Sequence, residues 1–223
     1  MKHLHMTLSV FGVVTLFSSG LYAASITIQP EAIAGKDVSI GQYVTHSTAG
    51  EMYVLNNYSS STLYSLIEFD LSIVPVGATI NSAVMEIFLE GSIFQGIPAN
   101  YLINAYRITS NWNETSITWA TQPPLDFTVP VANSGGTPNN NTWVVWDITN
   151  FVNDWYLGVN NNYGVELRNS GEGTYYYFTS SDSAASSLHP KLTIEYTSYV
   201  IPEPATFLLL GMGILAWVRR RSN

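Results

Sequence analysis

The sequence predicts one all-β domain, a sandwich or a barrel with a single short helix, between two hydrophobic terminal segments. Short stretches of alternating apolar and polar residues recur along residues 24–199, separated by clusters of Gly, Pro, Asn and Ser. Many short strands with such turns are typical of sandwiches and barrels. Charged residues make up only 11% of the chain, so uncharged polar side chains must cover its surface, as in many extracellular β-domains.

The strand predictions depend on alternation. Residues 78–89 give the clearest pattern, with Ala83, Met85, Ile87 and Leu89 in one row and Ile80, Ser82, Val84, Glu86 and Phe88 in the other. Further strands are expected at residues 63–70, 101–108, 126–131, 142–148, 163–168, 173–179 and 191–196. We find no internal repeat and no linker, which predicts one domain over residues 24–199.

One short helix is expected after residue 148. Thr149 is a candidate N-cap, and Gly158 can end the helix in a left-handed conformation. Between them, Phe151, Val152 and Trp155 form one apolar face.

Four tryptophans are predicted to lie in the core: Trp112, Trp119, Trp146 and Trp155. The carboxylates of Asp70 and Asp147 precede hydroxyl residues at strand ends, where such groups commonly order turns. We therefore interpret both aspartates as structural.

Residues 1–23 have the order of parts found in a signal peptide. Lys2 supplies a positive start, residues 8–16 are mostly apolar, and small residues gather from Ser18 to Ala24. Cleavage after Ala23 or Ala24 suits signal peptidase, so we expect export through the Sec machinery. A buried N-terminal strand or an anchor helix is the alternative.

Residues 200–223 form a second terminal segment. Pro202, Glu203 and Pro204 precede an apolar run over residues 205–218, and a cluster of three arginines follows: Arg219, Arg220 and Arg221. A helix over that run would span about 21 Å, against about 30 Å for the hydrocarbon core of a bilayer. The run is short for a permanent anchor, and the arginines hold its far end in the cytoplasm.

These C-terminal residues resemble the PEP-CTERM sorting signal, in which Pro-Glu-Pro, a short hydrophobic helix and an arginine cluster follow one another. The resemblance implies a Gram-negative source, processing by a membrane exosortase after transient insertion in the inner membrane, and release or attachment at the cell surface or in the extracellular matrix. Such proteins usually accompany exopolysaccharide production. A plain C-terminal membrane tail is the alternative.

Residues 35–197 carry a second resemblance, to the DNRLRE domain. The motifs that carry it are Phe69-Asp70-Leu71-Ser72, the stretch from Trp112 to Trp119, Trp146-Asp147-Ile148-Thr149, Phe178 with Ser180, and Pro190, Leu192 and Tyr196. The DNRLRE domain is similar to carbohydrate-binding modules of polysaccharide lyases, so the resemblance implies a jelly-roll β-sandwich and glycan binding. Some members hold acidic sugars with basic side chains, most of which this chain lacks.

Aromatic side chains at outer positions are the candidate ligand-binding residues. Flat aromatic faces stack on the C–H surfaces of sugars, and nearby polar groups bind the hydroxyls. Alternation with Tyr176 and Phe178 leaves Tyr175 and Tyr177 on the outer face of their strand, and Trp143 takes an outer position on another. An ordinary β-surface is the alternative, because Tyr and Trp favour strands.

The case for an enzyme is weaker. The chain has no cysteine, which excludes thiol nucleophiles and cysteine-based zinc sites, and only His46 and His189 remain after the signal peptide. Glu114 is the best lone carboxylate, but a lyase or glycosidase built around it needs a second acid about 5–10 Å away. We favour a structural role for Glu114 in the turn between Trp112 and Trp119.

The charge balance bears on the partners. The formal net charge is −8, and between the terminal segments the only basic residues are Lys36, Arg107, Arg168 and Lys191. We therefore expect no nucleic-acid binding, because phosphates need a basic surface. We expect a polysaccharide ligand, with a purely structural matrix or adhesion role as the alternative. The acidic excess permits a structural Ca²⁺, for which the sequence indicates no ligands.

Overall fold

The structure is a computed structural model that describes residues 21–30, 35–47, 50–94, 102–128, 132–135 and 138–199. Contacts divide the chain into two units, and the unit Ala23–Ser198 is the one described below. Most of the predicted signal peptide and the whole segment 200–223 lie outside the described residues. Within the described ranges, no helix is long and apolar enough to cross a membrane.

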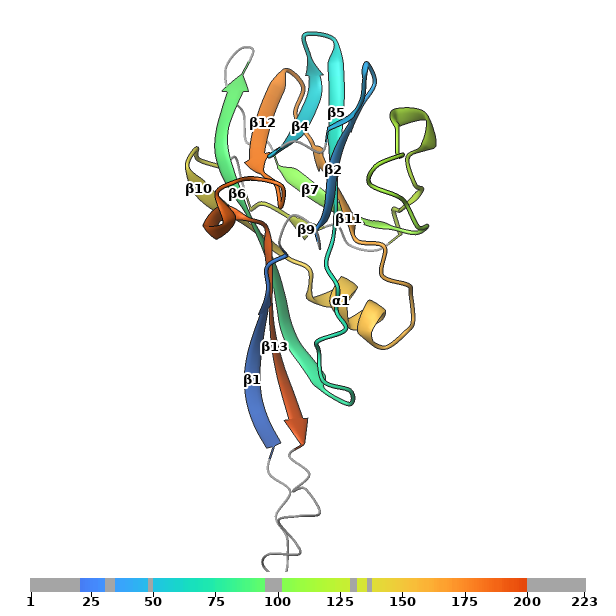
Figure 1. The fold of residues 1–223 in the computed structure, drawn as a ribbon, viewed down its shortest axis with the longest axis vertical. Helices are drawn as coiled ribbons and strands as arrows, with labels where there is room; N and C mark the ends of the chain where they lie inside the picture. Colours follow the sequence, from blue (N-terminus) through green and yellow to red (C-terminus); the bar gives the residue numbers. More distant parts are fainter. Residues whose placement is uncertain are drawn as a thin grey trace, which may run out of the picture. The chain divides into compact units, whose positions relative to one another are not determined.

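Antiparallel strands make up most of the fold (Figure 1). They are β1 (Leu21–Ile28), β2 (Lys36–Gly41), β3 (Val44–Ser47), β4 (Glu51–Tyr58), β5 (Ser61–Glu68), β6 (Thr79–Phe94), β7 (Ile103–Ile108), β8 (Leu125–Asp126), β9 (Ala132–Asn133), β10 (Thr142–Asp147), β11 (Val165–Asn169), β12 (Thr174–Thr179) and β13 (Lys191–Tyr199). The helices are α1 (Thr149–Tyr156), η1 (Trp119–Thr121) and η2 (Ser186–Leu188).

The strands form one antiparallel sheet that curls into a sandwich with two layers. In the layer we call the first sheet, β6 pairs with β13 along its first half, with β12 along its end and with β10 on its other edge. β4 lies beside β12, and β1 beside β13 (Figure 1). In the second sheet, β2, β5, β11 and β7 lie in that order, with β3, β8 and β9 at the margins. The predicted all-β fold of jelly-roll type is confirmed.

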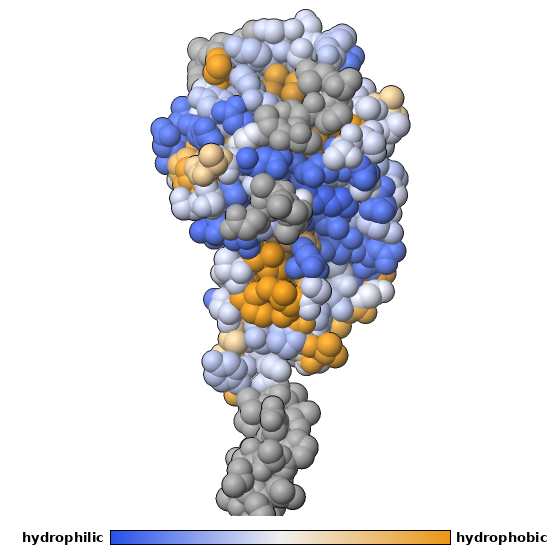
Figure 2. Space-filling model, in the orientation of Figure 1, coloured by the Kyte–Doolittle hydropathy of each residue, from blue (hydrophilic) through white to orange (hydrophobic). Residues whose placement is uncertain are grey.

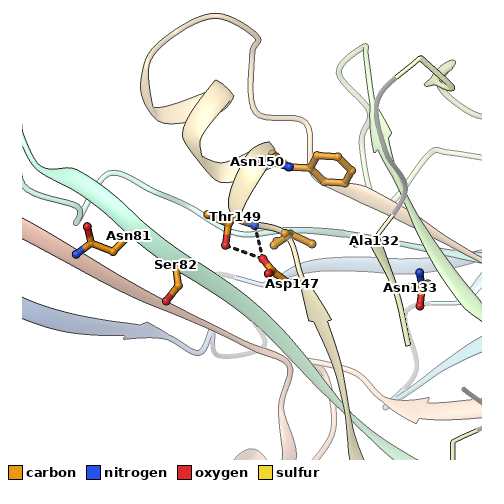
Figure 3. Close-up of a pocket in the computed structure, with 9 residues that line it drawn as sticks. Asn81, Ser82, Ala132, Asn133, Asp147, Thr149 and Asn150 are labelled. Atoms are coloured by element: carbon orange, nitrogen blue, oxygen red, sulfur yellow. Dashed lines mark hydrogen bonds between the residues drawn. The ribbon is translucent and has the colours of Figure 1, made fainter. Parts of the chain in front are cut away.

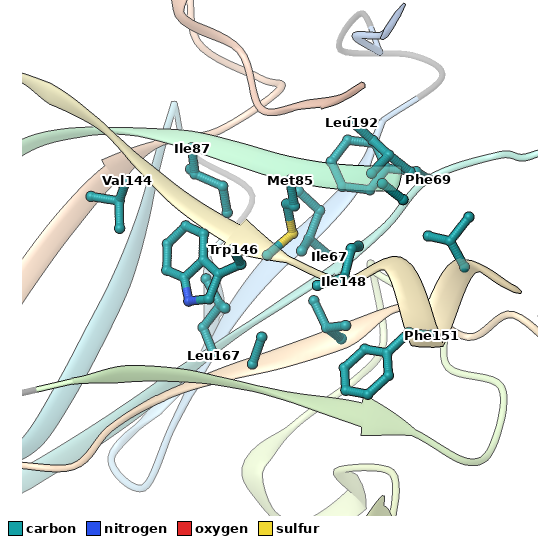
Figure 4. Packing of buried hydrophobic residues seen from close by; sticks show 14 of the residues in the cluster. Ile67, Phe69, Met85, Ile87, Val144, Trp146, Ile148, Phe151, Leu167 and Leu192 are labelled. Atoms are coloured by element: carbon teal, nitrogen blue, oxygen red, sulfur yellow. The ribbon is translucent and has the colours of Figure 1, made fainter. Parts of the chain in front are cut away.

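The core lies between the two sheets (Figure 4). Met85, Trp146 and Phe178 from the first sheet meet Ile67 and Leu167 from the second, and all five side chains are buried. Burying a side chain of this size contributes about 1.5–3 kcal/mol, which makes this layer the main source of stability.

Trp146 adds a polar contact between the layers. Its Nε1 donates to the carbonyl of Ile103, on the second sheet, at 2.7 Å. The indole therefore fills the core and also satisfies a backbone acceptor there.

A smaller cluster covers part of the outer side of the second sheet. The loop after β7 brings Trp112 and Ile117 onto Val38, Ile40 and Leu66. The Nε1 of Trp112 donates to the carbonyl of Tyr163 at 2.9 Å, and Asn113 Oδ1 accepts from the amide of Thr115 at 3.0 Å. Packing and loop hydrogen bonds thus hold this cover on the sheet.

The prediction that all four tryptophans lie in the core is wrong for Trp119. Trp112, Trp146 and Trp155 are buried, whereas Trp119 is half-buried and packs on Tyr64 with ring centroids 5.0 Å apart. Trp119 opens the one-turn helix η1 at the margin of the small cluster, where the loop leaves the sheet.

Helix α1 buries the predicted face, Phe151, Val152 and Trp155, but its start differs from the prediction. The N-cap residue is Ile148, and Thr149 is the first residue of the helix. The Thr149 hydroxyl accepts from the amide of Ala83 on β6 at 2.9 Å. Gly158, with φ +69, follows the helix in the left-handed conformation that was expected.

Two strand predictions need correction. The strand expected over residues 126–131 is reduced to Leu125–Asp126, and the residues beyond 128 lie outside the described part until Ala132. Ile80 is buried although Ser82 is half-exposed, since the register with β13 shifts between Glu195 and Tyr196. Such a bulge turns a side chain to the other face.

The described surface is largely polar, as the composition predicts. Figure 2 shows one face of the molecule, on which hydrophilic residues cover most of the described area and hydrophobic residues gather mainly below its middle. With few charges in the chain, that polarity comes mainly from hydroxyl and amide groups.

Candidate functional site

The outer face of the first sheet carries the aromatic residues that the sequence indicated. On β12, Tyr176 and Phe178 are buried, while Tyr175 and Tyr177 are half-buried and point outward. Tyr175 and Tyr177 thus lie on the outer face of β12, as predicted. Their role in ligand binding stays a prediction.

These two tyrosines are part of a cluster with two residues of the neighbouring strand, β4. The ring of Tyr175 lies 5.7 Å from the ring of Tyr53, 5.7 Å from that of Tyr58 and 5.8 Å from that of Tyr177, measured between centroids. The rings are tilted by 36–48° to one another. We call Tyr53, Tyr58, Tyr175 and Tyr177 the tyrosine cluster; Tyr175 is its centre.

The backbone of β6 closes one side of the cluster. Tyr177 faces Gly91 across the β12–β6 ladder and Tyr53 across the β12–β4 ladder. With no side chain at Gly91, the Tyr177 ring can lie down on the strand. The ring of Tyr177 therefore packs against the sheet and does not extend into solvent.

Carboxylates border the tyrosine cluster. Tyr53 Oη donates to Glu51 Oε2 at 2.5 Å, and this hydrogen bond raises the pKa of Tyr53 above its ordinary value. Partial burial also raises the pKa of Tyr175. Nearby, Thr179 Oγ1 donates to Glu90 Oε1 at 2.8 Å. The surroundings of the rings thus offer hydroxyl donors and carboxylate acceptors, the groups that bind sugar hydroxyls.

Trp143 lies on the same outer face, on β10 at the other edge of β6. Its ring meets Phe88 edge-on, with centroids 5.5 Å apart, and Lys191 Nζ lies 4.1 Å from its centroid. Lys191 Nζ is also 3.4 Å from Glu86 Oε2. Trp143 is half-buried, so part of the indole is covered by these neighbours. The fold brings all three predicted aromatic residues to one face, with Trp143 outside the tyrosine cluster.

A polar hollow of about 520 Å³ lies beside the start of α1 (Figure 3). Figure 3 shows Asn81 and Ser82 on one side and Asn133 on the other. Asp147 lies between them, and its Oδ1 accepts from the amide and the hydroxyl of Thr149 at 3.0 and 2.6 Å. Asp147 thus orders the turn, as predicted, and the hollow is a weaker candidate for sugar because it lacks an exposed ring.

The polar candidates for catalysis are engaged in structural contacts. Glu114 Oε1 accepts from the amide of Asp37 at 2.9 Å. This bond ties the loop between Trp112 and Trp119 to β2; the bond expected within that loop is not the one it makes. His189 is buried, with Nε2 2.8 Å from the carbonyl of Ser183. The side chain of His46 lies outside the described ones. Among the described residues, Glu114 and His189 therefore both make contacts that hold loops in place.

A structural Ca²⁺, which the acidic excess permits, stays a hypothesis. Within the part of the chain that the structure describes, no three His, Asp or Glu side chains lie together in a way that could hold a metal ion. Asp70, the other carboxylate interpreted as structural, accepts from the amide and the hydroxyl of Ser72 at 2.9 and 2.8 Å.

The sequence interpretation missed the half of the tyrosine cluster that β4 contributes. Met52 and Val54 are buried on either side of the half-buried Tyr53, so the alternation was present in the sequence. The alternating stretch is short, and Asn56 and Asn57, which follow it, are typical of a turn.

Comparison with known proteins agrees with this arrangement. Residues 38–196 match carbohydrate-binding module family 96, over nearly the same stretch as the resemblance to the DNRLRE domain. Residues 200–222 match the PEP-CTERM protein-sorting motif, which indicates export and a surface or extracellular location. A comparison with curated proteins gives no match. A sandwich with an outer aromatic face, and a family match over most of the chain, lead to one conclusion: this chain belongs to carbohydrate-binding module family 96, and it carries a PEP-CTERM sorting motif.

Proposed function

We propose that this protein is exported, processed by an exosortase, and holds polysaccharide at the cell surface or in the extracellular matrix through the outer face of its first sheet. The observation that carries the proposal is the tyrosine cluster, with Tyr175 at its centre. The sorting motif supports delivery to the surface, where the exopolysaccharide of the same cell is the ligand we propose.

The chemistry of the cluster suits uncharged sugar units. Ring faces stack on the C–H surface of a pyranose, and Glu51 and Glu90 lie where they can accept from hydroxyls. The same carboxylates repel a sugar that carries its own carboxylate. Hydroxyl-rich, neutral segments are therefore the favoured ligands of this face.

Tyr175→Ala tests the proposal most directly, because Tyr175 contacts every other ring of the cluster. Tyr43→Ala is the matched control: Tyr43 is 73% exposed in the turn between β2 and β3 and is not part of the cluster. Loss of one stacking ring costs about 0.5–1.5 kcal/mol, which is roughly a two- to tenfold loss of affinity. We expect that loss for Tyr175→Ala and none for Tyr43→Ala, measured by titration calorimetry with the exopolysaccharide of the source cells.

The same preparations distinguish binding from catalysis. Binding predicts that the polysaccharide keeps its length on size-exclusion chromatography after prolonged incubation with the exported protein. Chain shortening that disappears in Glu114→Gln, with the fold intact, would replace our proposal by a lyase or glycosidase. Equal affinity of Tyr175→Ala and the unmodified protein would remove the tyrosine cluster from the site.

A further inference from the structure

The outer face of the second sheet carries a different cluster, built around a cation. Arg168 on β11 lies over the ring of Tyr64 on β5, with Cζ 4.1 Å from the ring centroid. The same Cζ is 5.8 Å from the ring centroid of Tyr106 on β7 and 6.0 Å from that of Phe127, which follows β8. We call Arg168, Tyr64, Tyr106 and Phe127 the guanidinium cluster.

A buried carboxylate fixes the orientation of Arg168. Its Nε donates to Glu166 Oε1 at 2.6 Å, two residues earlier on the same face of β11. The Glu166 side chain is fully buried, and its Oε2 has no hydrogen-bond partner among the described residues. Burial raises the pKa of Glu166, while Arg168 lowers it in part. With Nε committed to Glu166, the two terminal amino groups of Arg168 remain as donors in a fixed plane.

The aromatic members of this cluster are accessible. The side chain of Phe127 is 65% exposed and meets Tyr106 edge-on, with ring centroids 5.4 Å apart. Tyr64 and Tyr106 are half-buried, and the side chain of Arg168 keeps 26% of its surface exposed. Three aromatic rings therefore flank the guanidinium group of Arg168 at the surface. This part of the second sheet lies beside the loop that carries Trp112 and Ile117.

The two clusters lie on opposite sides of the sandwich. Tyr176 and Phe178, which alternate with the tyrosine cluster on β12, belong to the core between the sheets. Val165 and Leu167, which alternate with Glu166 and Arg168 on β11, belong to the same core. One ligand chain cannot stack on both clusters without passing around the domain.

We propose that the guanidinium cluster is a second sugar-binding site, and that the protein holds two polysaccharide chains at once and cross-links them. This inference rests on the proposed function, because it takes the tyrosine cluster as the first site. The second site takes a sugar unit that stacks on Phe127 and Tyr106 and offers an oxygen acceptor to Arg168. That acceptor is a carboxylate or a hydroxyl, whereas the acidic surroundings of the tyrosine cluster favour neutral units alone.

The number of sites is measured by titration calorimetry of the exported protein with two probes, cellohexaose and hexagalacturonate. Phe127→Ala removes an exposed ring of the second site without opening the core, and Arg168→Lys keeps the charge but loses the planar donor pair. Tyr175→Ala weakens the first site. With cellohexaose we expect two sites in the unmodified protein, the first weakened in Tyr175→Ala and the second weakened in Phe127→Ala and Arg168→Lys. With hexagalacturonate we expect one site, whose affinity falls roughly two- to tenfold in Phe127→Ala and is unchanged in Tyr175→Ala.

Cross-linking is measured by dynamic light scattering of the source exopolysaccharide mixed with the protein. We expect particle growth with the unmodified protein and clearly less growth with Phe127→Ala or Tyr175→Ala, although each variant still binds. A single site lost in Tyr175→Ala and unchanged in Phe127→Ala would overturn the second site and leave the proposed function intact. A single site lost only in Phe127→Ala would overturn the proposed site at the tyrosine cluster together with cross-linking.

Discussion

The phenol ring of Tyr177 lies directly on the backbone of Gly91: a Cβ added at residue 91 would be 1.9 Å from Tyr177 Oη and 2.2 Å from its Cζ. The two residues face each other across the ladder between β12 and β6. Since real Cβ contacts are never that short, the position of this ring depends on the glycine. A residue without a side chain thus shapes the candidate binding surface.

We therefore predict that Gly91→Ala weakens glycan binding although it changes no aromatic residue. The new methyl group displaces the Tyr177 ring, and we expect the affinity to fall roughly two- to tenfold, as for the loss of one stacking contact. In a double-mutant cycle by titration calorimetry, Gly91→Ala should cost little more once Tyr177→Ala is present. Fully additive losses would show that the two residues act independently.

The core prediction concerns Trp146, which both fills space and donates to Ile103. Trp146→Ala should destabilise the domain by about 3–5 kcal/mol, and Phe178→Ala, whose ring is 6.2 Å from that of Trp146, by a similar amount. Trp146→Phe should retain much of the packing and lose the hydrogen bond, which costs about 1–3 kcal/mol for the unsatisfied carbonyl. Urea denaturation measures all three. A negligible effect of Trp146→Phe would mean that water replaces the donor.

Stability should also depend on pH through Asp37. Its side chain is 1% exposed, Oδ2 accepts from the amide of Ser181 at 2.9 Å, and burial raises its pKa to about 6, with the charges of Glu114 and Asp182 adding to the rise. The folded state therefore holds this proton more tightly than the unfolded chain does. The resulting stabilisation is complete below the ordinary pKa of 3.8 and is lost as the pH rises through about 6.

We expect this group alone to lower the free energy of unfolding by about 2 kcal/mol between pH 4 and pH 7.5. Asp37→Asn cannot ionise and should remove that part of the pH dependence. The free energy of unfolding of the variant, relative to that of the unmodified protein, should therefore increase as the pH rises. Urea denaturation at a series of pH values gives the difference between the two. Parallel curves for the two proteins would show that folding does not raise the pKa of Asp37.

Processing gives the fourth prediction. If an exosortase acts near Pro202-Glu203-Pro204, intact mass spectrometry of protein released at the surface should show a chain that lacks about 20 C-terminal residues. These residues include the apolar run over 205–218, which is short for a permanent anchor. Replacement of Pro202 and Pro204 by alanine should leave the segment attached. Full-length chain that stays in the inner membrane would contradict the prediction.

The sequence was most informative where a strand has one buried face. Tyr176 and Phe178 fix the alternation of β12, so the outward direction of Tyr175 and Tyr177 followed from the period of two. Trp119 shows the limit of this reasoning, because nothing in the local pattern tells whether a loop tryptophan lies over a core or at its margin.

The clusters themselves could not be predicted, since they depend on pairing between distant strands. Arg168 meets Tyr64, Tyr106 and Phe127 only because β5, β11 and β7 are neighbours in the sheet. A single sequence does not fix that order. The contact between Gly91 and Tyr177 is equally non-local, and a glycine inside a strand signals close approach without naming the partner.

The pairing of β13 with the first half of β6 has a mechanical consequence. The ladder extends from Lys191 opposite Glu86 to Thr197 opposite Thr79, and β13 is the last strand before the sorting motif. In a chain held from its C-terminal side and pulled by ligand at β12, tension acts along these two strands. Because the hydrogen bonds of an antiparallel pair are perpendicular to the strands, such a pull shears all of them together and does not open them one by one. In a chain attached at its C-terminal side, β13 would therefore be loaded in the geometry that best resists force.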